Sequence, residues 1–452
     1  MGHARLFLQH SLANYASVAS VLPTSAPASR SMAAELIRRG GAPTRILEVG
    51  PGVGPITAQV VRAMGPEDRL TCVELIPEYA DVLRERFRTE PDFRAVADRC
   101  EVITGDVRDL AEEHAEFDVA IVSVPFNTLG EEVTQQIFEV VRRVLRPGGT
   151  CTYIEYAWLR TLRDAFTGLV GRGGGHSAFL DEQLRRYRYR TDLVLGNVPP
   201  SWAHHLRFTE VADEEAEQVA AAPVPTTSRL WPGMGIDRDG IAVAAGAGVL
   251  AGVTALATRR ATGAARRLWL LPALAGVAGA AFFRDPVRQI PADPDAVVSS
   301  VDGKVLKVER LESDEHLGPG PWLRIATFLS IFSVHINRAP VAGRVVEVID
   351  RNEGGYAAAM KPAAEHNVAK TVVLQTRRGR VGVTQRTGMV ARRIVVRHGR
   401  GSVLAKGERY GLIRFGSRTD VYLPADAAEA VVSKGAVVRG GSTVIARWSS
   451  AG

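Results

Sequence analysis

The stretch Ile46-Leu47-Glu48-Val49-Gly50-Pro51-Gly52-Val53-Gly54 decides the fold of the first half of the chain. A strand-like apolar run ends here in three alternating glycines, and a helix-like segment follows. Glycines let a backbone approach a ligand closely where a Cβ atom would clash. The Gly-x-Gly-x-Gly spacing differs from the Gly-x-Gly-x-x-Gly of dinucleotide-binding domains, so it disfavours a nicotinamide cofactor.

Strand-like and helix-like segments alternate around this turn throughout residues 1–212. The short apolar runs are Arg45–Val49, Leu70–Glu74, Cys100–Thr104 and Val119–Val124. This rhythm is typical of a doubly wound α/β domain with a parallel sheet. Residues 213–235, rich in Ala, Glu and Pro, are expected to form a linker.

Two carboxylates follow the glycine turn in strand order. Glu74 ends the next strand, where a carboxylate can accept both hydroxyls of a ribose, and Asp106 follows the third strand, where it can bind an adenine amino group. The candidate cofactor site therefore contains Glu48, Gly50, Gly52, Gly54, Glu74 and Asp106. With this pattern the domain resembles the class I S-adenosylmethionine-dependent methyltransferases, which implies that cofactor.

Four flanking segments extend the resemblance over most of residues 10–208. They are Val21–Arg30, Ser123–Phe126, Arg146–Gly149 and Asn197–Pro200. These segments are similar to bacterial phospholipid N-methyltransferases, and the similarity implies methylation of the amine of phosphatidylethanolamine. Tyr15, Tyr153 and Glu155 are polar candidates near the reacting amine, and each is equally well explained as an ordinary strand or surface residue.

Residues 236–285 contain two uncharged segments, Ile241–Thr258 and Leu268–Phe283. Each is close to the lower limit of about 17 residues for a helix that spans a bilayer. The connector carries Arg259, Arg260, Arg266 and Arg267. A spanning pair would place these arginines opposite the enzyme domains, against the positive-inside rule. We therefore expect a shallow hairpin in one leaflet, with a buried helical pair as the alternative.

Residues 286–452 become β-like, with Val and Ile runs broken by Gly, which predicts a compact β-sandwich or barrel. Within them Ser417 directly follows Gly416, between two strand-like runs. The Ser417 hydroxyl can attack the preceding carbonyl, which Gly416 leaves sterically open. Cleavage by this route converts Ser417 into a pyruvoyl group, a ketone that acts as an electron sink.

An ordered set of segments surrounds this dipeptide. They are Phe283–Pro286, Ser300–Val305, Phe332–Pro340, Val390–Ile394 and Arg414–Arg418. They resemble phosphatidylserine decarboxylase of the short, archaeal-type subfamily over about residues 280–448. The resemblance implies an Asp302–His335–Ser417 triad for self-cleavage, with His335 also a candidate proton donor in decarboxylation. Phe332 departs from the long-type relatives, which carry a second histidine at that position.

Two further motifs bear on the cleavage site. Gly441-Ser442-Thr443 resembles the cleavage tripeptide of the long-type enzymes, but a cut there would release only residues 442–452. A cut between Gly416 and Ser417 releases enough chain for two or three strands, so we predict that cut and two chains that remain associated. Glu365-His366-Asn367 also departs from the relatives and is expected to have a structural or substrate-contact role.

The charge and the cysteine content limit which kinds of binding partner and metal site are expected. The net charge is +7, and the basic excess lies in residues 213–452, which suits an anionic lipid surface. No zinc-finger spacing or helix-turn-helix signal indicates nucleic acid. Cys72, Cys100 and Cys151 lack metal-ligand spacing, so neither a metal site nor a disulfide framework is expected. The N-terminus has no charged segment followed by an apolar run, so we expect no secretory signal.

These features predict a bifunctional enzyme of phospholipid biosynthesis, membrane-associated at the cytoplasmic face. Phosphatidylserine would be decarboxylated to phosphatidylethanolamine, which would then be methylated toward phosphatidylcholine. A homo-oligomer is expected. Two alternatives remain open: the first half could be a regulatory or binding module for a monofunctional decarboxylase, or a methyltransferase for another amine.

Overall fold

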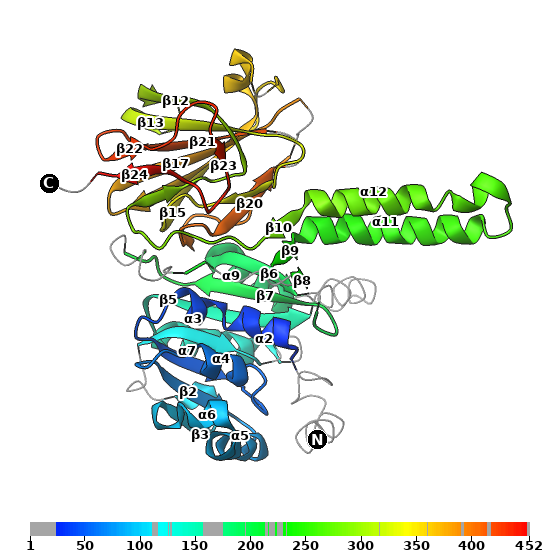
Figure 1. Cartoon of the computed structure of the whole chain (residues 1–452). Helices are drawn as coiled ribbons and strands as arrows, with labels where there is room; N and C mark the ends of the chain where they lie inside the picture. The colour runs from blue at the N-terminus through cyan, green and yellow to red at the C-terminus, as the bar shows by residue number, and fades with distance from the viewer. Residues whose placement is uncertain are drawn as a thin grey trace. The chain divides into compact units, whose positions relative to one another are not determined.

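The structure is a computed structural model of the whole chain. It describes residues 24–110, 116–124, 126, 129–156, 175–194, 196–212, 216, 222–223, 229–231, 233–315, 317–358, 360–389, 393–413 and 417–449. The chain divides into two compact units, Met1–Thr227 and Ser228–Gly452, and each has its own core (Figure 1).

The first unit is built on a seven-stranded sheet in the order β3-β2-β1-β4-β5-β7-β6 (Figure 1). Its strands are β1 (Arg45–Val49), β2 (Arg69–Glu74), β3 (Cys100–Thr104), β4 (Phe117–Val122), β5 (Leu145–Tyr156), β6 (Arg188–Val194) and β7 (Ser201–Arg207). Strands β1 to β5 pair in parallel, whereas β7 is antiparallel to both β5 and β6. The predicted doubly wound α/β fold is confirmed, with two antiparallel strands added at one edge.

Helices cover both faces of this sheet. They are α2 (Ala26–Met32), α3 (Ala34–Arg38), α4 (Thr57–Ala63), α5 (Pro77–Thr89), α6 (Pro91–Arg94), α7 (Glu131–Val144) and α9 (Gly175–Tyr187), with short 3₁₀ turns η1 (Ala97–Arg99) and η2 (Val107–Asp109). Successive residues of β1 belong to different cores, because side chains alternate along a strand. Ile46 joins the core with α4 and α5, and Leu47 joins the core with α7. Burial on both faces explains why β1 and β4 read as continuous apolar runs.

The second unit begins with a helical hairpin. A small sheet of β8 (Arg229–Trp231), β9 (Met234–Ile236) and β10 (Arg284–Pro286) closes its base, and α11 (Arg238–Ala257), η4 (Gly263–Arg267) and α12 (Leu270–Phe282) form its arms (Figure 1). The arms touch through small residues: a Cβ atom added at Gly276 would lie 2.6 Å from the Cβ atom of Ala247.

Helix α11 is long and apolar enough to cross a membrane, and only 11% of its apolar window, Asp239–Ala257, is buried. Helix α11 is therefore not buried within the described part of this chain.

The remainder of the second unit is mainly β, as predicted. An eight-stranded sheet has the order β19-β15-β16-β17-β21-β13-β12-β23, beside two three-stranded sheets, β11-β24-β22 and β14-β20-β18. The strands are β11 (Ala296–Val298), β12 (Gly303–Asp314), β13 (Gly318–Leu329), β14 (Ile336–Arg338), β15 (Gly343–Arg351), β16 (Ala369–Thr376), β17 (Gly379–Arg386), β18 (Ile394–Val396), β19 (Val403–Leu404), β20 (Arg409–Ile413), β21 (Ser417–Pro424), β22 (Ala428–Ala430), β23 (Val437–Val438) and β24 (Val444–Trp448), with one 3₁₀ turn, η5 (Pro362–His366).

Strand β21 lies inside the large sheet rather than at its edge. It pairs antiparallel with β13 from Ser417 to Pro424 and with β17 from Arg418 to Tyr422. The strand that begins at the predicted cleavage point is therefore hydrogen bonded on both sides.

The glycine of the Asp302-Gly303 pair has a steric role that can be tested. A Cβ atom on Gly303 would lie 2.0 Å from the carbonyl oxygen of Phe328, in the backbone of the neighbouring strand β13. Gly303→Ala should therefore cost about 1–3 kcal/mol, the usual range for overpacking. Gly399→Ala is the matched control because no atom lies within 4 Å of its Cβ position. Urea unfolding followed by tryptophan fluorescence measures both, and equal midpoints would contradict the steric role.

Candidate active sites

The glycine-rich turn after β1 forms an open cradle at the carboxyl end of the sheet. Gly50, Gly52 and Gly54 have φ angles of 68°, 58° and 84°, a region that residues with a Cβ atom rarely adopt. No heavy atom lies within 4 Å of a Cβ atom built on Gly52 or on Gly105, which follows β3. Space is therefore available beside both strand ends, where α/β domains bind their ligands.

Glu74, the last residue of β2, is joined to this cradle. One carboxylate oxygen accepts a hydrogen bond from the backbone N–H of Gly52 at 2.8 Å, and the other accepts from that of Ile76 at 3.0 Å. Burial raises the pKa of Glu74. Each carboxylate oxygen has a second lone pair, so Glu74 can hold the turn and accept ribose hydroxyls at once.

Asp106 caps the turn η2 after β3. Its carboxylate accepts hydrogen bonds from the backbone N–H of Arg108 at 2.9 Å and from the guanidinium of Arg108 at 2.7 Å. The side-chain bonds from Arg108 lower the pKa of Asp106, so the group is an ionised acceptor at neutral pH.

Glu48 occupies a different position from the other cofactor candidates. Its side chain is fully buried beneath the turn, with the Sγ atom of Cys72 at 3.8 Å from one carboxyl oxygen, and burial raises its pKa to about 7. Hydrogen bonding with the Thr57 side chain lowers this pKa, but burial is the larger effect.

The three polar candidates for the reacting amine have separate environments. The ring of Tyr153 is fully buried and packs edge-on against Phe126, at 5.4 Å between ring centroids. Glu155 is also buried, and one of its carboxyl oxygens lies 3.7 Å from Nε2 of His204. Tyr15 lies outside the described residues.

His335 is buried at the start of β14, against the base of the hairpin. Its ring stacks on that of Phe282, with 4.0 Å between centroids, and Nδ1 lies 2.9 Å from the carbonyl oxygen of Ser333. A carbonyl only accepts, so the proton sits on Nδ1 and Nε2 is left as an acceptor. Burial lowers the pKa of His335 to about 4, against the opposing effects of the Ser333 carbonyl and the charge of Asp302, so the ring is neutral at physiological pH.

Asp302 influences this histidine through its charge. Its carboxylate accepts hydrogen bonds from Arg288 at 2.7 Å and from the backbone N–H of Gly440 at 2.8 Å. The group that orients the imidazole is the carbonyl of Ser333, which the sequence reasoning did not single out. Ser333 belongs to the same motif as His335, but a backbone acceptor leaves no residue-type signal.

The segment around His335 is hydrogen bonded to both sides of the predicted cleavage point. The carbonyl of His335 accepts from the backbone N–H of Ile413 at 3.2 Å, before that point. Two residues farther along, Asn337 Oδ1 accepts from the hydroxyl of Thr419 at 3.3 Å, after that point. Gly416 lies outside the described residues, and the backbone of Ser417 pairs with Leu329.

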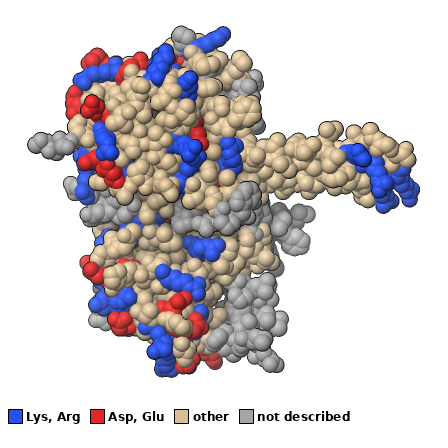
Figure 2. Space-filling model, in the orientation of Figure 1, with Lys and Arg blue, Asp and Glu red and all other residues tan. Residues whose placement is uncertain are grey.

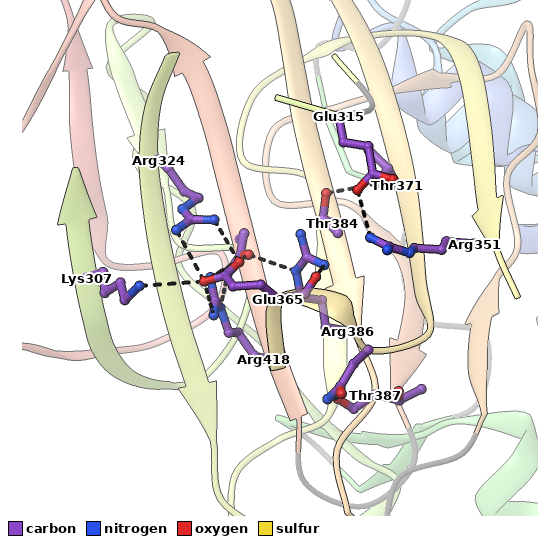
Figure 3. A network of polar contacts seen from close by, with 12 residues as sticks. Lys307, Glu315, Arg324, Arg351, Glu365, Thr371, Thr384, Arg386, Thr387 and Arg418 are labelled. Atoms are coloured by element: carbon purple, nitrogen blue, oxygen red, sulfur yellow. Dashed lines mark hydrogen bonds and ion pairs between the residues drawn. The ribbon is translucent and has the colours of Figure 1, made fainter. Parts of the chain in front are cut away.

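A network of charges surrounds the start of β21 (Figure 3). Arg418 donates to Glu365 at 2.9 Å and to Asp420 at 2.6 Å, and Glu365 also accepts from Arg324 at 2.9 Å. Arg386 donates to Asp420 at 3.1 Å from the neighbouring strand. Burial raises the pKa of Glu365, but hydrogen bonds and charge from Arg418 outweigh it and give a pKa of about 2.

This network gives Glu365 the structural role that the sequence allowed. Glu365 holds Arg418, the first residue after Ser417. Sequence reasoning missed the roles of Arg418 and Asp420 because their partners come from segments distant in the chain. Phe332, at the position of the long-type second histidine, is 80% exposed.

The buried carboxyl of Glu48 makes stability depend on pH. Its pKa of about 7 exceeds the usual 4.5, so between these values the unfolded state ionises first and stability falls as pH rises. Glu48→Gln removes this loss, and its melting temperature should therefore exceed that of the wild type by more at pH 8 than at pH 5. The exposed Glu67→Gln is the control. If the difference in melting temperature between Glu48→Gln and the wild type were the same at both pH values, the raised pKa of Glu48 would be contradicted.

Comparisons with known proteins identify one domain in each half of the chain. The sequence model for phosphatidylserine decarboxylase matches residues 279–446, and a methyltransferase-domain model matches residues 46–149. Among solved structures, the chain is similar to the O-methyltransferase TomG from Streptomyces achromogenes in complex with S-adenosylmethionine (19% identity, 46% of this chain, 90% of TomG, TM-score 0.33).

The methyltransferase CcbJ from Streptomyces caelestis is 22% identical over 29% of this chain, with a TM-score of 0.24, and the match spans about half of CcbJ, 52%. The chain therefore contains two enzyme domains, a methyltransferase domain at residues 46–149 and a phosphatidylserine decarboxylase domain at residues 279–446.

Proposed function

We propose that this chain makes phosphatidylethanolamine from phosphatidylserine with a pyruvoyl group derived from Ser417, and that it methylates the amine of phosphatidylethanolamine with S-adenosylmethionine. The observation that carries the decarboxylase half is the contact of the His335 segment with both sides of the cleavage point. The enzyme would act at the cytoplasmic face of the membrane, where S-adenosylmethionine is supplied.

Self-cleavage requires a base for the Ser417 hydroxyl. The neutral His335 ring, an acceptor at Nε2, has the protonation state for that role, and the Ser333 carbonyl holds its tautomer. The negative charge of Asp302 favours the imidazolium that forms when the ring takes the proton. The pyruvoyl ketone supplies the electron sink for loss of CO₂, and His335 is the candidate proton donor afterwards.

The fit to S-adenosylmethionine comes from the cradle. The open space at Gly52 and Gly105 admits a ligand, Glu74 would accept the ribose hydroxyls, and Asp106 would accept the adenine amino group. Glu48, buried beneath the turn, would support the cradle from inside. The bound cofactor supplies the electrophilic methyl group, and the domain's task is to align the accepting amine.

The second candidate is a binding module that regulates a monofunctional decarboxylase. The intact cradle and the Glu74–Gly52 hydrogen bond favour a bound cofactor, which both candidates allow. Incubation with S-adenosylmethionine labelled in its methyl group and phosphatidylethanolamine vesicles separates them. Label in the lipid supports methylation, label in another amine indicates a different substrate, and cofactor binding without transfer indicates the regulatory module.

The cleavage prediction is tested by mass spectrometry of the purified chain. Wild type should yield residues 1–416 and 417–452, the smaller chain carrying an N-terminal pyruvoyl group. Ser417→Ala should remain one chain and lack decarboxylase activity, because the attacking hydroxyl is gone. Ser442→Ala is the control and should be cut like the wild type. An active, uncut wild-type enzyme would overturn this mechanism.

The independence of the two sites gives a further prediction. Gly52→Val places a β-branched residue at a φ of 58°, which should distort the cradle and lower affinity for S-adenosylmethionine at least tenfold, while decarboxylation is retained. Gly65→Ala is the control, because Gly65 precedes the amino end of β2, opposite the cradle at the carboxyl end, and its Cβ position has ordinary contacts. Calorimetric binding and CO₂ release measure the two properties. A parallel loss of decarboxylation in a folded variant would contradict the independence.

A further inference from the structure

The shaft of the hairpin is apolar on all its exposed sides. No charged residue occurs between Asp239 and Arg259 or between Arg267 and Arg284. The exposed large side chains are Val243, Val249, Leu250, Val253 and Leu256 on α11 and Leu270, Leu271, Leu274 and Val277 on α12. Figure 2 shows the shaft without charged side chains and a cluster of basic ones at its end.

This surface does not suit a helix that lies along a membrane. Such a helix keeps a charged or polar face in water, and neither α11 nor α12 has one. The hydroxyl of Thr254 donates to the carbonyl of Leu250 at 2.7 Å, and that of Thr258 donates to the carbonyl of Thr254 at 2.8 Å. The two threonine side chains of this apolar arm thus find partners within the same arm, as the hydrocarbon region requires.

Of the two arms, α11 has the length of a full crossing, and α12, with 13 residues, is shorter. Helix α11 contains 20 residues, and at about 1.5 Å per residue it extends roughly 30 Å, close to the thickness of the hydrocarbon core. A hairpin inserted into one leaflet would leave its arginine connector near the middle of the bilayer, where each charge is costly.

The connector is suited to lipid headgroups. Arg259, Arg266 and Arg267, with Ala255 and Trp269, line an open hollow of about 430 Å³. None of the four connector arginines makes an ion pair within the described part of the chain. Guanidinium groups bind phosphate well, and a half-exposed Trp269 beside them matches the aromatic residues found at membrane interfaces.

The base of the hairpin presents a second apolar surface. Ile331 and Phe332 are 54% and 80% exposed, and the carbonyl of Phe332 accepts a hydrogen bond from Arg284, the first residue after the hairpin, at 2.5 Å. This loop lies directly before His335 in the chain. An apolar loop at the base would enter the near leaflet beside the decarboxylase site.

We propose that the α11–α12 hairpin crosses the bilayer, with its arginine connector among the headgroups of the far leaflet and the Ile331–Phe332 loop in the near leaflet. This replaces the shallow hairpin expected from sequence. The positive-inside rule gives no bias against it, because the base carries Arg229, Arg238, Arg284 and Arg288, as many arginines as the connector. The proposal rests on the proposed function only in taking a phospholipid bilayer as the site of the reaction.

Single cysteines report the topology without using activity. Thr262→Cys marks the connector and Ser433→Cys marks the decarboxylase domain, and both positions are exposed. Spheroplasts from cells that express each variant are treated with a membrane-impermeant maleimide before and after lysis. The wild-type chain, which has no added cysteine, shows how much label the native cysteines take up; Cys72 and Cys151 among them are buried. Labelling of the two marks from opposite sides of the membrane supports the crossing, and labelling from the same side overturns it.

A second measurement guards against incomplete labelling. A crossing hairpin is held by apolar burial, so the wild-type chain should stay with the membrane pellet in alkaline carbonate and in high salt. Release into the supernatant would overturn the proposal. Cleavage at residue 416 is followed in the same samples, so a failed topology is distinguished from a failed decarboxylase assignment.

Discussion

Backbone pairing on both edges of β21 is the constraint on which the decarboxylase unit depends. In the cleavage that we propose, the new chain end at Ser417 would be held only by noncovalent contacts. Strands β13 and β17 bond to it from either side, and the buried charges of Arg418 and Asp420 join it to Glu365 and Arg386. Because one missing partner in such a buried network leaves an uncompensated charge, the network favours a single position for the strand.

The two halves of the chain achieve their sites by different means. In the first unit, a local turn with three left-handed glycines creates the cradle, and one carboxylate from the adjacent strand secures it. In the second unit, the site is assembled from segments far apart in sequence: the end of α12, the start of β14 and the start of β21. A cradle of the first kind is suited to a diffusible cofactor, whereas under the proposed cleavage the second arrangement would have to survive a break in its own backbone.

This difference explains how much could be predicted. The glycine turn, the parallel strands and the Gly416-Ser417 pair have local signatures, because φ angles and strand burial are visible in residue types. Residue types do not encode long-range pairing or contacts of backbone atoms. For this reason the sequence did not show the antiparallel placement of β7 beside β5, the role of the Ser333 carbonyl, or the ion pairs of Arg418. Glu48 is a similar case. The sequence motif predicts its position beside the turn, but only the packing of the structure shows that its side chain is buried.

The stack of Phe282 on His335 has a consequence for how the protein can change. The last turn of the hairpin excludes water from the imidazole, and this desolvation is the largest influence on its pKa. The same ring-to-ring contact fastens the hairpin, through a small apolar cluster with Phe283, Val334 and Ile336, to the β unit. The proposed attachment to lipid and the basicity of the histidine would therefore depend on one contact, and a substitution that changes either of them would alter the other.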